Sequence, residues 1–174
     1  MDYRRHYVPG GRYFFTVVTE GRQPLLVENI ERLRAAVRRV RERYPFAVEA
    51  MVVLPDHLHT LWRLPEGDSE FSLRWMVLKR VFSSGLPRQP TSVSQAGKRE
   101  KGIWQRRFWE HSIRDVDDWR RHMDYIHFNA VKHGYADSPL AWPHSSFAHW
   151  VGRGLYEPGW GGAAPAALPS VAGE

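Results

Sequence analysis

The sequence contains no cysteine and no long apolar run, and each absence narrows the possible functions. Without cysteine the chain has no disulfides, no thiolate zinc or iron–sulfur centre and no cysteine nucleophile. Any metal must therefore be held by histidine, carboxylate or amide oxygen. No stretch is long enough to span a membrane, and Met1–His6 lacks the apolar run of a signal peptide. We expect a cytoplasmic protein without a membrane partner.

The composition is that of one folded domain with an excess of positive charge. Of its 174 residues, 43% are apolar and 13% aromatic, which allows a sizeable core. The net charge of +6 favours a polyanionic partner, because basic side chains that neutralise phosphates release counterions. A basic surface that serves only solubility is the alternative. Arginine outnumbers lysine, and its capacity to bind phosphate and stack on bases favours nucleic acid.

Two histidines within Val52–Trp62 form the most informative local pattern. His57 and His59 follow a Pro-Asp turn, and residues two apart in a strand point to the same face of a sheet. The two imidazoles could hold a metal ion between them. They could equally be hydrogen-bonded sheet histidines, since the chain has nine histidines and a chance match is common.

Hydrophobic patterning predicts four strands and three main helices. Strands are expected where β-branched and aromatic residues gather, with the first strand central: Arg12–Thr19, Phe46–Leu54, His57–Leu64 and around Phe108–Ile113. Helices are expected where apolar residues recur every three or four positions: Ile30–Tyr44, Ser72–Phe82 and Asp117 to about Gly134. Asn29 and Asp117 are the expected caps, and Arg74 is expected outside the apolar stripe of the second helix. The order matches an α+β fold, a ferredoxin-like βαββαβ antiparallel sheet with an added C-terminal helix.

Residues 1–156 are expected to form the single domain. Residues 88–102 are polar, basic and without periodicity, which predicts a mobile basic loop inside the domain. Trp142–Trp150 is irregular but aromatic and is expected to pack on the domain. Residues 157–174 contain no Lys or Arg and are rich in Gly, Ala and Pro, which predicts a disordered tail.

The last predicted helix carries two polar residues on one face. Tyr125 and Asn129 are four positions apart, and they lie about 100° around the helix from the apolar stripe. If this helix packs on the sheet face that carries the histidines, two imidazoles, an amide oxygen and a phenol converge. Such a site could polarise a phosphodiester and use Tyr125 as the nucleophile. Otherwise Tyr125 is a packing residue at the edge of the core.

Several motifs together resemble REP-associated tyrosine transposases, in the single-tyrosine branch of the HUH endonuclease superfamily. The resemblance runs from Tyr3 to about Gly161. Its motifs are Pro-Gly-Gly-x-Tyr-Phe-Phe-Thr at 9–16, His-Leu-His at 57–59, Trp-Gln-Arg-Arg-Phe-Trp-Glu-His at 104–111, Tyr-Ile-His-Phe-Asn at 125–129 and Trp-Pro-His-Ser-Ser-Phe at 142–147.

The resemblance implies an HUH-type catalytic domain that uses a divalent cation, Mg²⁺ or Mn²⁺. It implies a bacterial, nucleoid-associated endonuclease and transposase that cleaves single-stranded or hairpin DNA at repetitive extragenic palindromes (REP elements). By position, Tyr125 matches the nucleophile that forms a 5′-phosphotyrosine link, and His57, His59 and Asn129 match the metal ligands. The resemblance favours a monomer, and a dimer stays open.

Further DNA contacts are expected from basic and hydroxyl side chains along the chain. The candidates are Arg4, Arg5, Arg12, Lys79, Arg80, Arg106, Arg107, Lys132, Ser145 and Ser146. For the two serines, packing on the core is as good an explanation as base contact.

Two other functions remain open from the sequence. A zinc-dependent hydrolase would use His57, His59 and a third ligand such as Glu110 or His111, with water as the nucleophile. Such an enzyme would not need Tyr125. A non-catalytic regulator would bind REP or other single-stranded DNA without cutting it.

Overall fold

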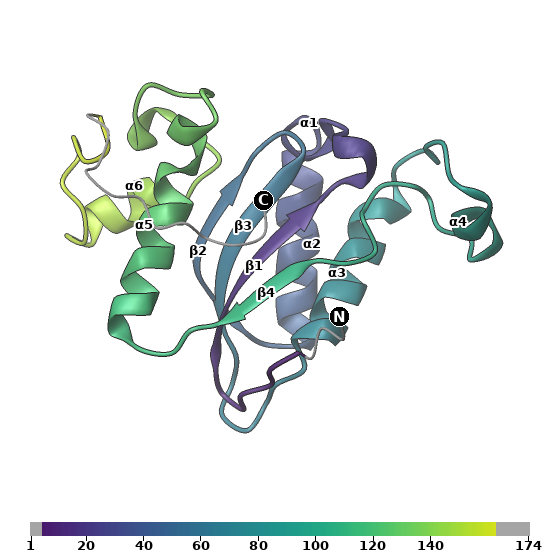
Figure 1. Cartoon of the computed structure of the whole chain (residues 1–174), viewed down its shortest axis with the longest axis horizontal. Helices are drawn as coiled ribbons and strands as arrows, with labels where there is room; N and C mark the ends of the chain where they lie inside the picture. Colours follow the sequence, from purple (N-terminus) through teal and green to yellow (C-terminus); the bar gives the residue numbers. More distant parts are fainter. Residues whose placement is uncertain (1–4, 163–174) are drawn as a thin grey trace.

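A four-stranded antiparallel sheet forms the centre of the molecule (Figure 1). The computed structural model describes residues 5–162. Within them the strands are β1 (Arg12–Val18), β2 (Ala47–Val53), β3 (His57–Arg63) and β4 (Trp109–Ser112). Their spatial order is β2-β3-β1-β4. This is the order of a ferredoxin-like sheet, so the predicted fold class is confirmed.

The first strand, β1, is central, as its two apolar faces predict. It pairs with β3 on one side and with β4 on the other. Successive side chains of a strand point to opposite faces. Phe14 therefore lies in the core on one side of the sheet, and Phe15 lies in the core on the other; both are fully buried.

Two helices cover the first face of the sheet (Figure 1): α2 (Ile30–Arg43) and α3 (Phe71–Ser84). Leu33 and Val40 of α2 are buried, whereas its arginines are exposed. Trp62 of β3 stacks on Trp75 of α3 with ring centroids 4.3 Å apart. Removal of this apolar surface from water holds the helices on the sheet. Within residues 5–162, no helix is both long enough and apolar enough to cross a membrane.

The opposite face is covered by α5 (Val116–Lys132). Its residues Met123 and Ile126 share a hydrophobic cluster with residues of the sheet. Asp115, not the predicted Asp117, caps the helix, because its carboxylate accepts a hydrogen bond from the Asp118 backbone nitrogen at 2.8 Å. Asp117 lies in the first turn, where a negative charge still favours the helix N-terminus.

Two further sequence expectations are corrected by the structure. The Asn29 side chain does not cap α2; it donates to the carbonyl of Leu25 in the short helix α1 (Leu25–Glu28) that precedes α2. Arg74, expected outside the apolar stripe of α3, is only 2% exposed. Its guanidinium is paired with Asp68 at 2.7 Å and also donates to backbone carbonyls, which makes its burial tolerable.

Local structure is also present where the sequence predicted none. The remaining short elements are η1 (Glu20–Arg22), α4 (Val93–Gly97), η2 (Pro139–Ala141) and α6 (Phe147–Gly152). The predicted basic loop contains α4, which Ser92 and Gln95 stabilise with a capping box. The predicted tail begins with a turn in which the ring centroids of Trp160 and Phe147 lie 5.8 Å apart. The large Trp160 ring provides apolar area that the Gly-rich residues around it lack. Residues 163–174 of that tail lie outside the described residues.

Candidate active site

The strand β3 presents two buried imidazoles towards α5. His57 and His59 are 3% and 0% exposed. They lie on the same face of β3 because they are two residues apart. Their ring centroids are 5.1 Å apart. Two imidazoles therefore meet on one face of the sheet, as their spacing predicts.

Each imidazole is oriented by a hydrogen bond at its Nδ1 atom. His57 Nδ1 lies 2.6 Å from Asp56 Oδ1, and His59 Nδ1 lies 2.8 Å from Thr16 Oγ1. Thr16 is available because it pairs with His59 in the register of β1 and β3. A neutral imidazole that donates through Nδ1 keeps its lone pair on Nε2, which is the usual arrangement of a metal-binding histidine.

The electrostatics of this turn favour a neutral His57. Burial lowers the pKa of the His57 imidazole, and the hydrogen bond to Asp56 offsets only part of that effect. Burial acts to raise the pKa of the Asp56 carboxyl, but hydrogen bonds from His57 and Arg22 outweigh it and hold this pKa below its ordinary value. Among residues 5–162, the buried His57 Nε2 has no hydrogen-bond partner. A cation would satisfy such an atom.

One face of α5 runs along the two imidazoles. The Tyr125 ring lies 5.2 Å from that of His59, and the His133 ring, at the C-terminal cap of α5, lies 5.0 Å from that of His57. Asn129 is four residues from both Tyr125 and His133, so it lies between them on the same face. Tyr125 and Asn129 are 2% and 0% exposed. The structure thus brings the four central residues of the predicted site together.

Lys132 contacts the candidate nucleophile directly. Its Nζ atom lies 3.5 Å from the phenolic oxygen of Tyr125 and 5.0 Å from the centre of the ring. The two residues are seven positions apart, and side chains of a helix lean back towards its N-terminus. The sequence indicated Lys132 only as one of many DNA contacts, whereas the structure places its ammonium at Tyr125.

A second group of potential metal ligands lies at the N-terminal end of α5. His111, Asp118 and His122 have ligand atoms within 4.8 Å of one another. The Asp118 carboxylate accepts hydrogen bonds from His111 at 2.8 Å and from the backbone and guanidinium of Arg114 at 3.0 and 3.1 Å. An arginine on the carboxylate already offsets its charge, so this cluster is built as an ion-pair network.

Neither Glu110 nor His111 can complete a zinc site with His57 and His59. Glu110 pairs with Phe15 and shares its face of the sheet, which is opposite to that of His59. His111 is on the same face as His59, but β1 lies between their strands. Phe14, the β1 partner of His111, packs 5.6 Å from the His59 ring and fills the intervening space. The prediction of a zinc site made from His57 and His59 with Glu110 or His111 is therefore wrong.

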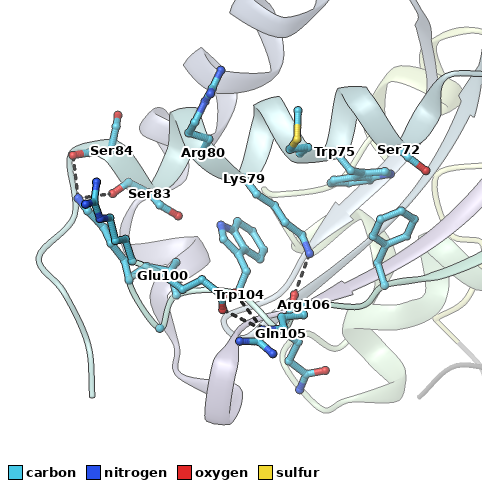
Figure 2. Close-up of a pocket in the computed structure, with 16 residues that line it drawn as sticks. Ser72, Trp75, Lys79, Arg80, Ser83, Ser84, Glu100, Trp104, Gln105 and Arg106 are labelled. Carbon is cyan, nitrogen blue, oxygen red and sulfur yellow. Dashed lines mark hydrogen bonds and ion pairs between the residues drawn. The ribbon is translucent and has the colours of Figure 1, made fainter. Parts of the chain in front are cut away.

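The basic residues predicted to contact DNA do not form one surface. Lys79, Arg80 and Arg106 line a single cavity beside α3 (Figure 2). Arg12 pairs with Arg63, at the end of β1 opposite to His57, and binds Glu49.

The other predicted basic contacts are scattered. Arg5 lies 4.5 Å from the Phe108 ring and 3.7 Å from a carboxylate oxygen of Glu110. Arg107 is exposed. Arg4 lies outside the described residues. Only the group beside α3 therefore forms a defined cavity.

The two serines predicted as DNA contacts bond to the protein. Ser146 Oγ accepts a hydrogen bond from the Met51 backbone nitrogen at 2.9 Å and lies 2.8 Å from His127 Nε2. Ser145 Oγ accepts from the Phe147 backbone nitrogen at 3.2 Å, at the start of α6. These bonds support the packing explanation for Ser146 in particular. Base contact by either hydroxyl stays a prediction.

Three residues at this site had no role in the sequence interpretation. The sequence could have indicated a role for Asp56, since a carboxylate next to a candidate metal-binding histidine often orients that histidine. Thr16 had none, because its contact depends on strand register. His133 follows Asn129 by four residues, so the spacing that linked Tyr125 to Asn129 would also have indicated His133.

Comparisons with known proteins agree with this geometry. Residues 8–129 match the family described as Transposase IS200 like. Two curated relatives named as REP-associated tyrosine transposases, from Haemophilus influenzae and Escherichia coli, are each 44% identical to this chain. Each alignment covers 92% of this chain and, in that order, 93% and 91% of the relative.

A solved structure of a REP-associated tyrosine transposase bound to a REP hairpin extends the comparison. It is 43% identical, has a TM-score of 0.83, and the match covers all of this chain and 97% of the other. The chain belongs to the IS200-like transposases and, within them, to the REP-associated tyrosine transposases. The resemblance carried by the sequence motifs is thus confirmed, and with it the enzyme class of a DNA-cleaving transposase.

Proposed function

We propose that this protein cleaves single-stranded DNA at REP-type hairpins through a 5′-phosphotyrosine intermediate. The observation that carries the proposal is the convergence of Tyr125 with the oriented imidazoles of His57 and His59. The related structure bound to a REP hairpin supports the choice of substrate.

His57, His59 and Asn129 would hold a divalent cation, Mg²⁺ or Mn²⁺, through two imidazole nitrogens and an amide oxygen. The buried Nε2 of His57 and the hydrogen bonds at both Nδ1 atoms fit this role. Three protein ligands leave positions open for substrate. When bound, the cation supplies the positive charge that polarises a phosphodiester oxygen.

Tyr125 would be the nucleophile. Its phenolic oxygen attacks the phosphorus and loses its proton, the bond between phosphorus and the 3′ oxygen breaks, and that oxygen takes up a proton. The products are a 5′-phosphate linked to Tyr125 and a free 3′-hydroxyl. A phenol is a weak nucleophile at neutral pH, so positioning must contribute much of the rate. Contacts with His59 and Lys132 hold the ring in one direction.

Lys132 would bind the phosphate that Tyr125 attacks. Its ammonium lies beside the phenolic oxygen, so a phosphorus in line with that oxygen brings its own oxygens close to Nζ. A positive charge there stabilises the negative charge that the phosphate carries through the reaction. Lys132 thus acts on the substrate, whereas Asp56 and Thr16 act through the histidines.

Cleavage of an end-labelled REP hairpin strand tests this function. We expect cutting with Mg²⁺ or Mn²⁺, and we expect it to stop with EDTA or in the His57→Ala variant. His149→Ala is the matched control, because His149 is exposed on α6, away from these contacts, and should cut like the unchanged protein. Cleavage that continues at the same rate in EDTA would rule out the metal site. DNA binding without cutting under every condition would instead establish the non-catalytic regulator.

A further inference from the structure

A cavity of about 610 Å³ lies on the other side of the sheet from Tyr125, between α3 and residues 99–108. Its size falls in the range of about 300–1,000 Å³ that is common for ligand sites. Figure 2 shows Lys79 extending from α3 across this space towards the Gln105 carbonyl, with Trp104 beside it. We call it the α3 cavity; its principal lining residues are Trp75, Lys79, Arg80, Arg99, Trp104 and Phe108.

Lys79 is a partly buried cation in this cavity. Burial, with a smaller contribution from Arg5, lowers the pKa of its ammonium to about 8. The ammonium donates to the Gln105 carbonyl at 2.8 Å, and within residues 5–162 no carboxylate lies in ion-pair distance of it. Buried charges in proteins are normally paired. An anionic ligand would supply the missing partner.

The rim of the α3 cavity is basic and has defined structure. Five basic side chains line it against the single carboxylate of Glu100, which already binds Arg106 at 2.9 Å. Arg80 and Arg99 are exposed. Arg99 has a φ of 56°, which a non-glycine residue adopts only when its surroundings hold it. Lys101 holds this segment on α3 through bonds to three carbonyls at the end of the helix.

The walls of the cavity are aromatic. Trp75, Trp104 and Phe108 line it, and Lys79 Nζ lies 6.0 and 5.5 Å from the Trp104 and Phe108 ring centres. Among the described residues, the indole nitrogens of Trp75 and Trp104 are buried without hydrogen-bond partners. Aromatic side chains combined with basic groups suit a flat heteroaromatic base joined to a phosphate.

The α3 cavity lies at the end of the sheet that carries the catalytic histidines. Gln105 donates to the carbonyl of Val18 at 3.0 Å, and Val18 pairs with His57. Helices α3 and α5 cover opposite faces of the sheet. A DNA strand bound at Tyr125 can therefore reach the cavity by passing around this end of the sheet.

We propose that the α3 cavity binds one unpaired nucleotide of the substrate strand, outside the phosphate that is cleaved. Its base stacks against Trp104 and Phe108, and its phosphate is held by Lys79 with Arg80 and Arg99. A paired stem does not fit, because a base can stack inside an aromatic cavity of this size only when it is unstacked and unpaired. The inference rests on the proposed function for the identity of the strand.

The test measures DNA affinity by fluorescence anisotropy in the Tyr125→Phe background, so that the strand is not consumed. The probes are a labelled REP hairpin strand with unpaired flanks and a series in which one nucleotide at a time is abasic. Lys79→Met and Phe108→Leu change the cavity while retaining apolar volume, and Arg80→Ala changes an exposed side chain. Arg39→Ala, an exposed arginine on the neighbouring helix α2, is the matched control.

We expect one flank position at which the abasic change weakens binding by about tenfold, and we expect Phe108→Leu to abolish that penalty. Lys79→Met should weaken binding of every probe by about tenfold. It should also reduce the slope of log affinity against log salt concentration by about one, with a smaller effect for Arg80→Ala. Melting temperatures identify any variant that is merely unfolded, in which case Arg80→Ala alone decides the phosphate contact.

Three results would overturn the proposal. The cavity takes no nucleotide if the abasic profile is the same in Phe108→Leu and if Lys79→Met and Arg80→Ala bind like Arg39→Ala. It takes paired DNA if the sensitive position lies in the stem. Both outcomes leave cleavage by Tyr125 intact, so they are distinct from failure of the proposed function. If the parent protein binds no unpaired DNA at all, both proposals fail together.

Discussion

Asp56 and Thr16 determine how the two imidazoles are presented. Each contacts an Nδ1 atom, at 2.6 Å on His57 and 2.8 Å on His59. The shared face of the two histidines follows from strand alternation alone, and the shared face of Tyr125 and Asn129 follows from helix periodicity. The Thr16 contact could not be predicted, because it depends on the register between β1 and β3, which no local pattern fixes.

Asp56→Ala should weaken use of the metal without removing a ligand. The loss of a group that orients a metal-binding histidine commonly costs about 10–100-fold in metal affinity. We expect a correspondingly higher concentration of Mg²⁺ or Mn²⁺ for half-maximal cleavage. Arg22→Ala is the control, since it removes the 3.2 Å ion pair to Asp56 but leaves the contact between Asp56 and His57. An unchanged metal dependence in Asp56→Ala would show that His57 needs no such support.

Lys132→Met should slow cleavage by about tenfold or more while DNA binding changes much less. The reason is that its ammonium lies 3.5 Å from the Tyr125 oxygen, where phosphate charge is greatest during the reaction. Single-turnover rates measured at saturating protein separate the two effects. Lys132→Arg keeps the charge and should recover part of the rate. Equal losses in rate and affinity would mean that Lys132 is an ordinary phosphate contact.

The strands and long helices were predictable because each has a strong period and a clear end. Arg12–Val18 and His57–Arg63 match their predicted ranges to within one residue. The short helices α4 and α6 were not predictable, because five or six residues carry too little periodicity. The turn that holds Trp160 depends on tertiary contacts with Phe147 and Tyr156, which are invisible in its own Gly-rich composition.

His127 joins α5 to the segment that pairs with β2, and its burial predicts acid sensitivity. It lies 2.8 Å from Ser146 Oγ, and burial lowers its pKa to about 3. An unfolded histidine titrates near pH 6.5, so below that pH the unfolded chain binds a proton that the folded protein excludes. The contribution of His127 to the free energy of unfolding is complete above pH 6.5. It falls as the pH drops towards 3, by at most about 1.4 kcal/mol per pH unit.

Urea unfolding of the unchanged protein and of His127→Gln at several pH values checks this. Glutamine can retain a hydrogen bond to Ser146 but does not titrate. The free energy of unfolding should therefore fall less steeply in His127→Gln between pH 6.5 and pH 4. Parallel curves for the two proteins would show that His127 does not exclude the proton.

The basic groups of the whole molecule lie on more than one face. Lys132 lies on α5 beside Tyr125, whereas Lys79 and Arg80 lie on α3 across the sheet. The net charge alone predicted a polyanionic partner. The sequence could not show that the basic groups are divided between the Tyr125 site and the α3 cavity, because this division depends on the order of the strands in the sheet. A DNA strand that contacts both the Tyr125 site and the α3 cavity must be flexible, which favours unpaired DNA.

Affinity should fall steeply with salt and should favour a hairpin with unpaired flanks over a blunt duplex of equal length. Released counterions give the salt dependence, and aromatic side chains can stack only on exposed bases. Anisotropy titrations of both DNAs across a salt series measure the two effects together. Equal affinity for the duplex would contradict a path that includes an unpaired segment.

Peptide mapping reveals whether Tyr125 becomes covalently linked to DNA. Trypsin cuts after Arg121 and Lys132, so Tyr125 lies in the peptide His122–Lys132, where it is the only residue with a hydroxyl side chain. After reaction with a REP hairpin strand and Mg²⁺ or Mn²⁺, mass spectrometry should find this peptide carrying a 5′-phosphodeoxynucleotide, and Tyr125→Phe should give neither adduct nor cleavage. DNA attached to a peptide that contains Tyr135 or Tyr156, or cleavage that persists in Tyr125→Phe, would show that Tyr125 is not the nucleophile.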